Sequence, residues 1–316
     1  TATPSLETWA KVKDGRYNCV KLLERYGKAE LPTVRIIDLK EAAFGKVYPF
    51  TAPLIEALQK RLDRKEQSIL LLNHRGAATA LLCLECRRRV VSPVTQLPLT
   101  VHHERSGIPY LLDHASNLRM ALPDTCPHCK STQLLEIGAG TQRLEDLLKK
   151  ILPAARVLRA DADILETPED MRRVLSQMRE GKADIVLGNQ SVAYVLDLPG
   201  VTLAAVVVAD VGLSLPHFRA GERIFHLLSQ LTGRSGRHQP GEVIIQTFRP
   251  DAPEILYAAR HDPEGYLDTE LKLRRAAGYP PILPMIRFLL RGDIPEARAK
   301  SLQKNLQKRA QELDPQ

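Results

Sequence analysis

The 316-residue sequence lacks any long hydrophobic run. No stretch approaches the ~18 consecutive apolar residues that a membrane-spanning helix needs. Residues 1–10 also lack the basic and then apolar layout of a secretory signal peptide. These two absences predict a cytoplasmic protein with no membrane partner.

The sequence also lacks a GxxxxGK[ST] loop and a DExH acid pair. Such a loop cradles the β- and γ-phosphates of a nucleotide, and such acids hold its Mg²⁺ ion. We therefore expect these residues to form no complete site for ATP and Mg²⁺ on their own.

The composition is that of an ordinary globular protein, with 44% hydrophobic and 26% charged residues. The formal net charge is +8. A basic surface favours phosphate backbones, because binding releases the counterions of the nucleic acid. Many proteins that bind no nucleic acid are equally basic, so the charge alone leaves both interpretations open.

Cysteine is scarce, and four of the five cysteines form two CxxC pairs, CLEC at Cys83 and Cys86 and CPHC at Cys126 and Cys129. Two such pairs can close a tetrahedral shell of four thiolates around zinc. The alternative is a redox motif, but that motif normally begins a helix in a thioredoxin-like βαβ unit, which the pattern does not show. We predict one structural Zn²⁺ per chain, held in a module inserted over residues 80–133. The fifth cysteine, Cys19, is expected to be a small buried hydrophobic residue.

Around this module the sequence alternates between strand and helix signals. The clearest helix start is Thr167-Pro168-Glu169-Asp170, with a hydroxyl cap, a proline at the first position and two acids in the first turn. Alternation of this kind predicts a mostly parallel sheet wrapped by helices. The expected strands are residues 68–72, 134–137, 156–160, 184–187, 203–208 and 242–247, and the expected helices are 54–62, 141–151, 167–178 and 218–231.

After residue 250 the pattern changes to two helical stretches, a strand at 285–290 and a basic helix near 295–313. We interpret this part as a small α+β extension. The expected division is 1–79 for the end of a preceding lobe and the start of the main domain, 80–133 for the zinc module, 134–250 for the rest of the domain, and 251–316 for the start of a truncated C-terminal domain.

The sequence QLTGRSGR at 230–237 follows an expected helix and contains Gln230, Arg234 and Arg237. Arginines three apart and separated by small residues can reach a phosphate and stabilise charge on a transferring phosphoryl group, as an arginine finger does. The alternative is a solvated basic turn. The pattern QxxGRxGR is typical of the second, RecA-like lobe of a superfamily 2 helicase.

Several segments taken together resemble the PriA (primosomal protein N-prime) family of bacterial replication-restart DNA helicases. The resemblance covers nearly the whole chain. The matching segments are TATPSLE (1–7), NHRG (73–76), GAGTQR (138–143), FRAGER (218–223), QLTGRSGR (230–237) and GYPP (278–281).

The resemblance implies an ATP-dependent 3′–5′ helicase that restarts stalled replication forks. It implies nucleotide or DNA contacts at Asn73, Arg75, Gly188 and Gln190. The implied partners are single-stranded and forked DNA, primosome proteins, the loader of the replicative helicase and single-stranded DNA-binding protein, in the bacterial cytoplasm near the nucleoid. ATP and Mg²⁺ would bind only with a first lobe, which is expected to precede Thr1.

The basic run Arg87-Arg88-Arg89 follows the first cysteine pair directly and fits a contact with DNA phosphates. A solvated charged turn is the alternative.

The sequence departs from the family pattern in the zinc module. The family has eight cysteines and two zinc ions, whereas Ser92, Thr95, Asp113 and Ser116 stand at the inner four positions here. Hydroxyls are poor zinc ligands beside thiolates, so the second site is expected to hold no metal. The histidines at 102, 103 and 114 could supply nitrogen ligands, although we favour surface histidines.

A second departure lies in motif V, where Tyr194-Val195 replaces a Lys-Gly pair. A β-branched valine resists backbone conformations that glycine permits. The sequence therefore leaves two interpretations open. The parent protein is either a helicase motor, of which this chain alone is inactive, or a DNA-binding scaffold that lacks a working motor. An unrelated zinc-ribbon protein would have to produce all these motifs in order by chance.

Overall fold

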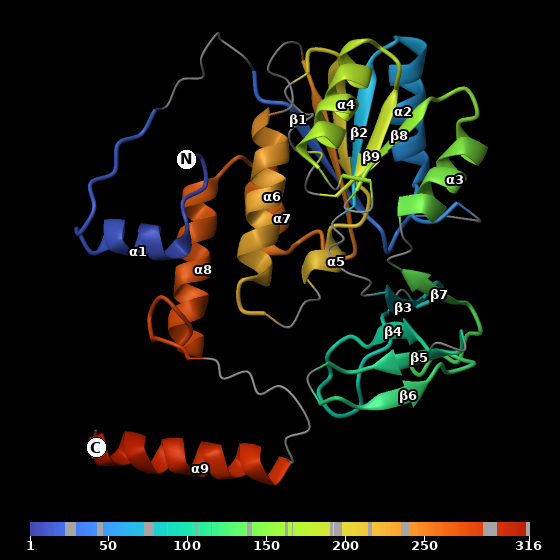
Figure 1. The fold of residues 1–316 in the computed structure, drawn as a ribbon. Coiled ribbons are helices and arrows are strands. Elements are labelled where there is room, and N and C mark those ends of the chain that lie inside the picture. The colour runs from blue at the N-terminus through green and yellow to red at the C-terminus, as the bar shows by residue number, and fades with distance from the viewer. Residues whose placement is uncertain are drawn as a thin grey trace. The chain divides into compact units, whose positions relative to one another are not determined.

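The computed structural model describes most of the chain (Figure 1). Its description leaves out residues 23–29, 43–46, 73–78, 87, 105–106, 115, 138–140, 162–163, 166, 190–191, 193–197, 214–216, 235–239, 287–295 and 314–316. The chain divides into two compact units, Thr1–Leu273 and Arg274–Gln316.

The first unit is built around a six-stranded sheet in which every described pairing is parallel. The strand order is β1-β11-β10-β2-β9-β8. Their bounds are Thr33–Asp38 (β1), Gln67–Leu71 (β2), Val157–Ala160 (β8), Ile185–Gly188 (β9), Val201–Val206 (β10) and Glu242–Thr247 (β11).

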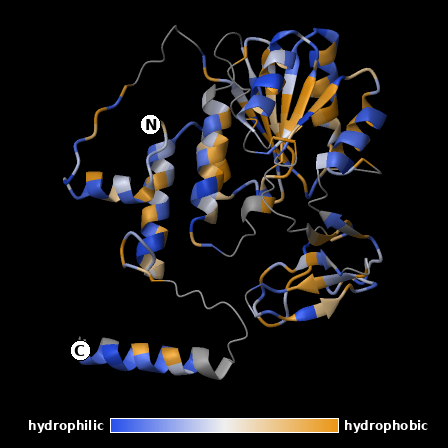
Figure 2. Cartoon of the chain, viewed as in Figure 1, coloured by the Kyte–Doolittle hydropathy of each residue, from blue (hydrophilic) through white to orange (hydrophobic). Residues whose placement is uncertain are grey.

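Every residue of the central strands β2, β9 and β10 is buried. Parallel strands read as continuous apolar runs when helices cover both faces of their sheet, and Figure 2 shows the apolar strands enclosed by helices with polar outer surfaces. Leu54 and Leu58 of one helix and Leu144 and Leu148 of another pack in one core cluster with Leu70 of β2. This core fixes the sheet whose strand ends carry the predicted site residues.

The helices start where the local chemistry predicts. Thr167 caps its helix by accepting a hydrogen bond from the Asp170 amide, and the Asp170 carboxylate accepts from the Thr167 amide in return, which completes a capping box. The helices are α1 (Leu6–Lys13), α2 (Ala52–Asp63), α3 (Thr141–Ile151), α4 (Pro168–Arg179), α5 (Asp210–Leu213), α6 (Ala220–Arg234), α7 (Pro253–Ala259), α8 (Pro263–Ala277) and α9 (Glu296–Leu313).

The inserted module is a separate antiparallel sheet of five strands in the order β6-β5-β4-β3-β7 (Figure 1). Its strands are Thr79–Cys83 (β3), Thr100–His103 (β4), Pro109–Leu112 (β5), Arg119–Ala121 (β6) and Leu134–Ile137 (β7). Leu81, Leu99 and Leu111 form its small core. β7 pairs with β3 and so closes this module. The strand at 134–137 therefore belongs to the antiparallel sheet, although it was expected among the strands of the parallel sheet.

The predicted α/β class, with a parallel sheet and an inserted cysteine-bearing module, is confirmed. Cys19 differs from expectation because it is exposed. It lies between α1 and β1, in a stretch without helix or strand where Val20 and Leu22 are also exposed. Among the described residues, no helix is both long enough and apolar enough to cross a bilayer.

The second unit begins in the last turn of α8. Gly278 follows that helix with φ +66°, which suits glycine at a helix end. The amide of Tyr279 donates to the carbonyl of Arg274, whose guanidinium donates to the carbonyl of Pro280. The expected strand at 285–290 is not seen at Met285 and Ile286, and its other residues lie outside the described ranges.

Candidate zinc centre and the carboxyl edge of the sheet

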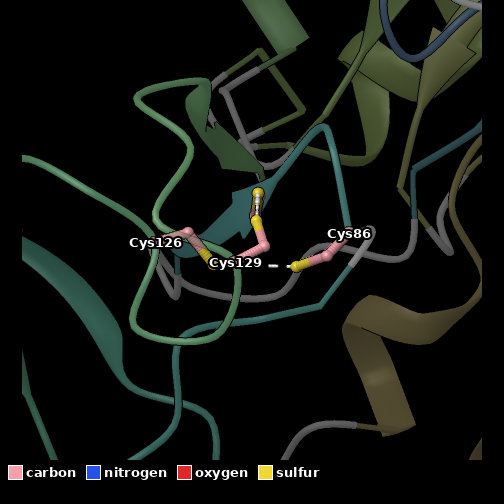
Figure 3. A group of neighbouring side chains, drawn as sticks. Cys86, Cys126 and Cys129 are labelled. Atoms are coloured by element: carbon pink, nitrogen blue, oxygen red, sulfur yellow. Dashed lines mark hydrogen bonds between the residues drawn. The ribbon is translucent and has the colours of Figure 1, made fainter.

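The four paired cysteines meet at one end of the module. Cys83 ends β3 and Cys86 lies in the turn after it, while Cys126 and Cys129 lie in the turn between β6 and β7. Their four sulfur atoms all lie within 4.8 Å of one another. Figure 3 shows the side chains of Cys86, Cys126 and Cys129 converging. The two CxxC pairs are therefore brought together as the sequence predicts.

The spacing of the sulfur atoms fits a tetrahedral zinc ion. The Sγ atoms of Cys83 and Cys129 are 3.5 Å apart, and those of Cys86 and Cys126 are 3.6 Å apart. Four thiolates at a Zn–S distance of about 2.3 Å would stand about 3.8 Å apart. The donor set and its spacing thus suit Zn²⁺, with all four positions filled by protein as in a structural site.

The electrostatics of the cluster favour a cation. Burial raises the pKa of the Cys86 thiol to about 12, and the neighbouring sulfurs add to this rise. Burial also opposes ionisation of Cys126, but the amides of Cys129 and His128 outweigh it and lower the pKa of that thiol to about 7. Of these two thiols, Cys126 therefore ionises more readily. A bound cation would favour the thiolate form of its ligands.

The inner positions of the module form a hydrogen-bonded cluster of their own. Asp113 is buried, and its Oδ2 accepts a hydrogen bond of 2.8 Å from Thr95 Oγ1 and one of 2.6 Å from Ser116 Oγ. Ser92, also buried, accepts from the amides of Val94 and Thr95. The side chains of Thr95, Asp113 and Ser116 satisfy one another, the Ser92 hydroxyl binds backbone amides, and none of the four offers a thiolate to a metal.

The histidines in this stretch do not join that cluster. His102 lies in β4 and His114 follows β5, and their Nε2 atoms are 3.2 Å apart. The two rings therefore meet edge to face on the module, and His114 is exposed. The side chain of His103 is outside the described part of the chain.

The three arginines of the predicted basic run differ in their exposure to solvent. Arg87 is not described and Arg88 is exposed, whereas Arg89 is half-buried. Burial lowers the pKa of the Arg89 guanidinium, and the negative charge of Asp210 acts in the opposite direction. Asp210 starts α5 and accepts hydrogen bonds from the Thr247 hydroxyl and the Phe248 amide. The charge of Arg89 in the module is thus within electrostatic reach of Asp210 at the carboxyl edge of the parallel sheet, and sequence reasoning gave no signal for this.

The carboxyl ends of β2 and β9 lie side by side, with Leu71 paired to Gly188 and the Leu72 amide donating to the Gly188 carbonyl at 2.7 Å. The predicted residues Asn73 and Arg75 follow the first strand, and Gln190 follows the second, but all three lie outside the described residues. Ligands of parallel α/β sheets bind at this edge.

Gly188 itself has a packing role. A Cβ atom at this position would collide with the carbonyl of Ala160 on β8 and with Val192. The glycine therefore allows close approach of the neighbouring strand, and this packing role does not depend on any ligand contact.

The predicted arginine-finger segment begins on α6. Gln230 is exposed in the last turns of this helix, and Arg234 is its final residue. The side chain of Arg234 and the whole of Arg237 lie outside the described part of the chain. The structure thus places residues 230–234 of the segment on α6 without describing how the arginine side chains point.

Two other predicted motifs come into direct contact. Glu7 at the end of TATPSLE accepts a hydrogen bond of 3.1 Å from Arg219 of FRAGER. Glu222 of the same motif is buried and accepts from the Leu6 amide at 3.0 Å. Segments more than 200 residues apart are therefore joined at the start of α1.

Curated proteins similar to this chain are replication restart proteins. PriA of Bacillus subtilis (strain 168) is 39% identical over 283 residues, which are 89% of this chain and 35% of that protein. PriA of Chlamydia pneumoniae is 34% identical over 302 residues, 94% of this chain and 40% of that protein. PriA of Chlamydia muridarum (strain MoPn / Nigg) is 35% identical over 323 residues, 100% of this chain and 42% of that protein. The chain thus spans between 35% and 42% of the length of these relatives.

No protein-family model matches the chain. Similar solved structures include Saccharomyces cerevisiae Dbp5 bound to RNA and ADP BeF3, with a TM-score of 0.36, 12% identity and coverage of 87% of this chain and 53% of that one. The Hef helicase domain of Pyrococcus furiosus has a TM-score of 0.31, 15% identity and coverage of 65% of this chain and 26% of that one.

Proposed function

Because this chain is homologous over most of its length to part of the replication restart protein PriA, we propose that it is the RecA-like second helicase lobe of such a protein. In this proposal the lobe carries the zinc module and leads into the C-terminal domain. The observation that carries it is the 39% identity to the Bacillus subtilis protein over 89% of the chain. The four-cysteine cluster agrees with it, because it is the metal centre that the resemblance implies.

The proposed task is to bind stalled or branched DNA forks and to promote assembly of the primosome and loading of the replicative helicase. The net charge of +8 supports contacts to DNA phosphates. Primosome proteins, the helicase loader and single-stranded DNA-binding protein are the proposed protein partners, in the bacterial cytoplasm at the nucleoid.

Zinc would be held by Cys83, Cys86, Cys126 and Cys129, and it would supply folding energy to the module without taking part in chemistry. Unwinding in the 3′–5′ direction would need ATP and Mg²⁺ bound against a first lobe. Arg234 and Arg237 would then steady the charge of the transferring phosphoryl group, with Gln230 beside them.

A second candidate is a PriA-like scaffold that binds DNA without a working motor. The sequence at motif V favours it, since Tyr194 and Val195 replace Lys-Gly. The segment NHRG at 73–76 resembles the family motif but has His74 where the family usually has arginine (NRRG). A phosphate-binding loop and a DExH pair elsewhere in the parent protein would support the helicase motor over the scaffold.

DNA binding tests the proposal with the chain as it is. Fluorescence anisotropy would follow zinc-loaded chain binding to a labelled fork, a single strand and a duplex between 50 and 200 mM salt. We expect weak binding to fork and single strand, with log K falling linearly as log salt rises.

Two variants make this test specific. Arg88→Ala removes an exposed charge beside the zinc centre, and it should lower the salt slope by about 0.7–0.9 if Arg88 neutralises one phosphate. Arg172→Ala is the matched control, because it removes an exposed arginine from α4 whose charge is already paired with Glu169 at 2.9 Å. Affinity that does not change with salt, or equal losses in both variants, would contradict phosphate-led binding through this face of the module.

A further inference from the structure

Two histidines on different segments of the module point their outer nitrogens at each other. His102 lies in β4, and His114 lies two residues after the end of β5. Their Nε2 atoms are 3.2 Å apart, and the rings meet at an interplanar angle of 67° with centroids 5.1 Å apart. The two nitrogens therefore converge from different directions on one point at the protein surface.

Neighbouring side chains hold this arrangement. His102 stacks on Tyr110, its cross-strand partner in β5, with centroids 5.6 Å apart and an angle of 23°. The guanidinium of Arg119 lies 3.9 Å from the centre of the same tyrosine ring. Its charge is partly offset by Glu104, whose carboxylate is 3.6 Å away. The His102 ring is thus already oriented before anything binds to it, which lowers the conformational entropy lost on binding.

We propose that His102 and His114 form a thiol-free site for a late first-row divalent cation such as Ni²⁺, Co²⁺, Cu²⁺ or Zn²⁺. Imidazole nitrogens bind these ions at about 2.0–2.1 Å. Two such nitrogens at angles between 90° and 109° would stand roughly 2.9–3.4 Å apart. The observed 3.2 Å falls within this range.

The site is open and separate from the cysteine centre. Within the described ranges, the four-cysteine cluster is the one place where three or more His, Cys, Asp or Glu ligand atoms gather. Among the described residues no third ligand joins the histidine pair, so water or a donor from a bound molecule would fill further coordination positions there. Two neutral ligands hold a cation less tightly than four thiolates, so this ion should exchange while the cysteine-bound zinc stays.

The test uses the zinc-loaded chain with Cys19→Ser, so that the exposed thiol does not compete for added metal. Calorimetry with NiCl₂ should show one equivalent of weakly bound Ni²⁺ beyond the zinc. His102→Gln and His114→Gln should each weaken that binding by at least the upper end of the roughly 10–100-fold that loss of a merely supporting residue costs. His261→Asn is the matched control, because it removes a histidine at a turn with φ 55°, a conformation that asparagine tolerates.

Proton NMR with Co²⁺ gives a second readout that does not depend on affinity. The ring signals of His102 and His114 should shift or broaden together at sub-stoichiometric Co²⁺, and those of His261 should not. Thermal unfolding without added metal checks that the Gln variants remain folded. Unchanged Ni²⁺ binding in both Gln variants would overturn the proposal, and so would histidine ring signals that Co²⁺ does not affect. The two histidines would then be joined only by a hydrogen bond.

Discussion

The hydroxyl of Thr95 donates a hydrogen bond of 2.8 Å to the buried carboxylate of Asp113, 18 residues further along the chain. Ser116 donates to the same oxygen, so this one carboxylate joins the turn at 92–95 to the turn at 113–116. Each turn has its two polar residues at the spacing of a CxxC pair. Hydrogen bonds thus cross-link positions at which thiolates would need a metal ion.

The first prediction concerns metal stoichiometry. We expect one zinc per chain to survive dialysis, because only one cluster offers four thiolates. Replacing the polar cluster by cysteine (Ser92→Cys, Thr95→Cys, Asp113→Cys and Ser116→Cys together) should raise this count to two by elemental analysis. The matched control is the double variant Ser92→Cys, Thr95→Cys, which completes one pair only and should keep one zinc. Two tightly bound zinc ions in the unaltered chain would show that the polar cluster holds metal after all.

The second prediction concerns removal of the structural metal. Cys126→Ser should release zinc and unfold the five-stranded module, because two turns then lose the ion that joins them. Hydrogen exchange should show lost protection in β3 to β7 and retained protection in β2, β9 and β10, whose core lies in the parallel sheet. Cys19→Ser is the control and should change neither the zinc content nor the exchange. A module that stays protected without zinc would mean that its small core and polar cluster suffice.

The third prediction separates two neighbouring arginines. Arg89→Ala should destabilise the first unit by about 0.5–3 kcal/mol, because it removes a half-buried positive charge that interacts electrostatically with the buried Asp210 carboxylate. Arg88→Ala removes an exposed charge and should leave stability within about 0.5 kcal/mol. Denaturant unfolding monitors both. Equal stability of the two variants would show that Arg89 does not support the sheet edge.

The fourth prediction concerns acid stability. Burial opposes ionisation of Glu7, but hydrogen bonds from Arg219 outweigh it and hold the pKa of this carboxyl below 4.5. Because the folded-state pKa is the lower one, the contribution of this pair is fully present above about pH 4.5 and is lost as the pH falls through the folded pKa. Glu7→Gln should therefore be less stable than the unaltered chain at pH 7, and the difference should shrink in acid.

Unfolding by denaturant at several pH values between 3.5 and 7 measures this difference, and acid release of zinc affects both proteins alike. Glu169→Gln is the control, since it breaks an exposed helix pair that contributes little. A difference that stays constant with pH would assign the effect of Glu7→Gln to packing and not to its charge.

Much of the parallel sheet follows from local patterns. The strand at 242–247 and the capped helix after Thr167 lie where apolar runs and cap residues predict them. The strand at 134–137 was also predicted, but its place in the smaller sheet was not, because a segment of four residues does not encode its partner. Pairing with β3 depends on contacts across more than 50 residues of sequence.

The gathering of the four paired cysteines could be predicted because metal ligands carry their chemistry in their spacing. The partial burial of Arg89 could not, since three consecutive arginines look alike until the fold buries one of them. The same holds for Asp113, which sequence reasoning placed at a lost ligand position without foreseeing that hydroxyls would surround its carboxylate.

The last prediction is that this chain alone neither hydrolyses ATP nor unwinds DNA. In motors of this class the nucleotide lies between two lobes, and the first lobe brings the phosphate loop, the metal-binding acids and the residue that positions water. The second lobe contributes arginines, and an arginine without a bound nucleotide has no charge to stabilise. Phosphate release should therefore stay at background when forked DNA is added to the purified chain. DNA-stimulated release that Arg234→Ala abolishes would reveal a nucleotide site within these residues.

The same reasoning extends to motif V in a parent protein that has an intact first lobe. Tyr194 and Val195 stand where the family has Lys-Gly, so a positive charge and a permissive backbone position are both missing. We expect Tyr194→Lys with Val195→Gly to speed fork unwinding in that protein while leaving equilibrium DNA binding nearly unchanged, because coupling between nucleotide and DNA is what improves. The control carries Tyr194→Phe, which alters the side chain without adding charge. If the paired change leaves unwinding untouched, motif V does not limit the motor, and the case for a motor-deficient scaffold loses its main support.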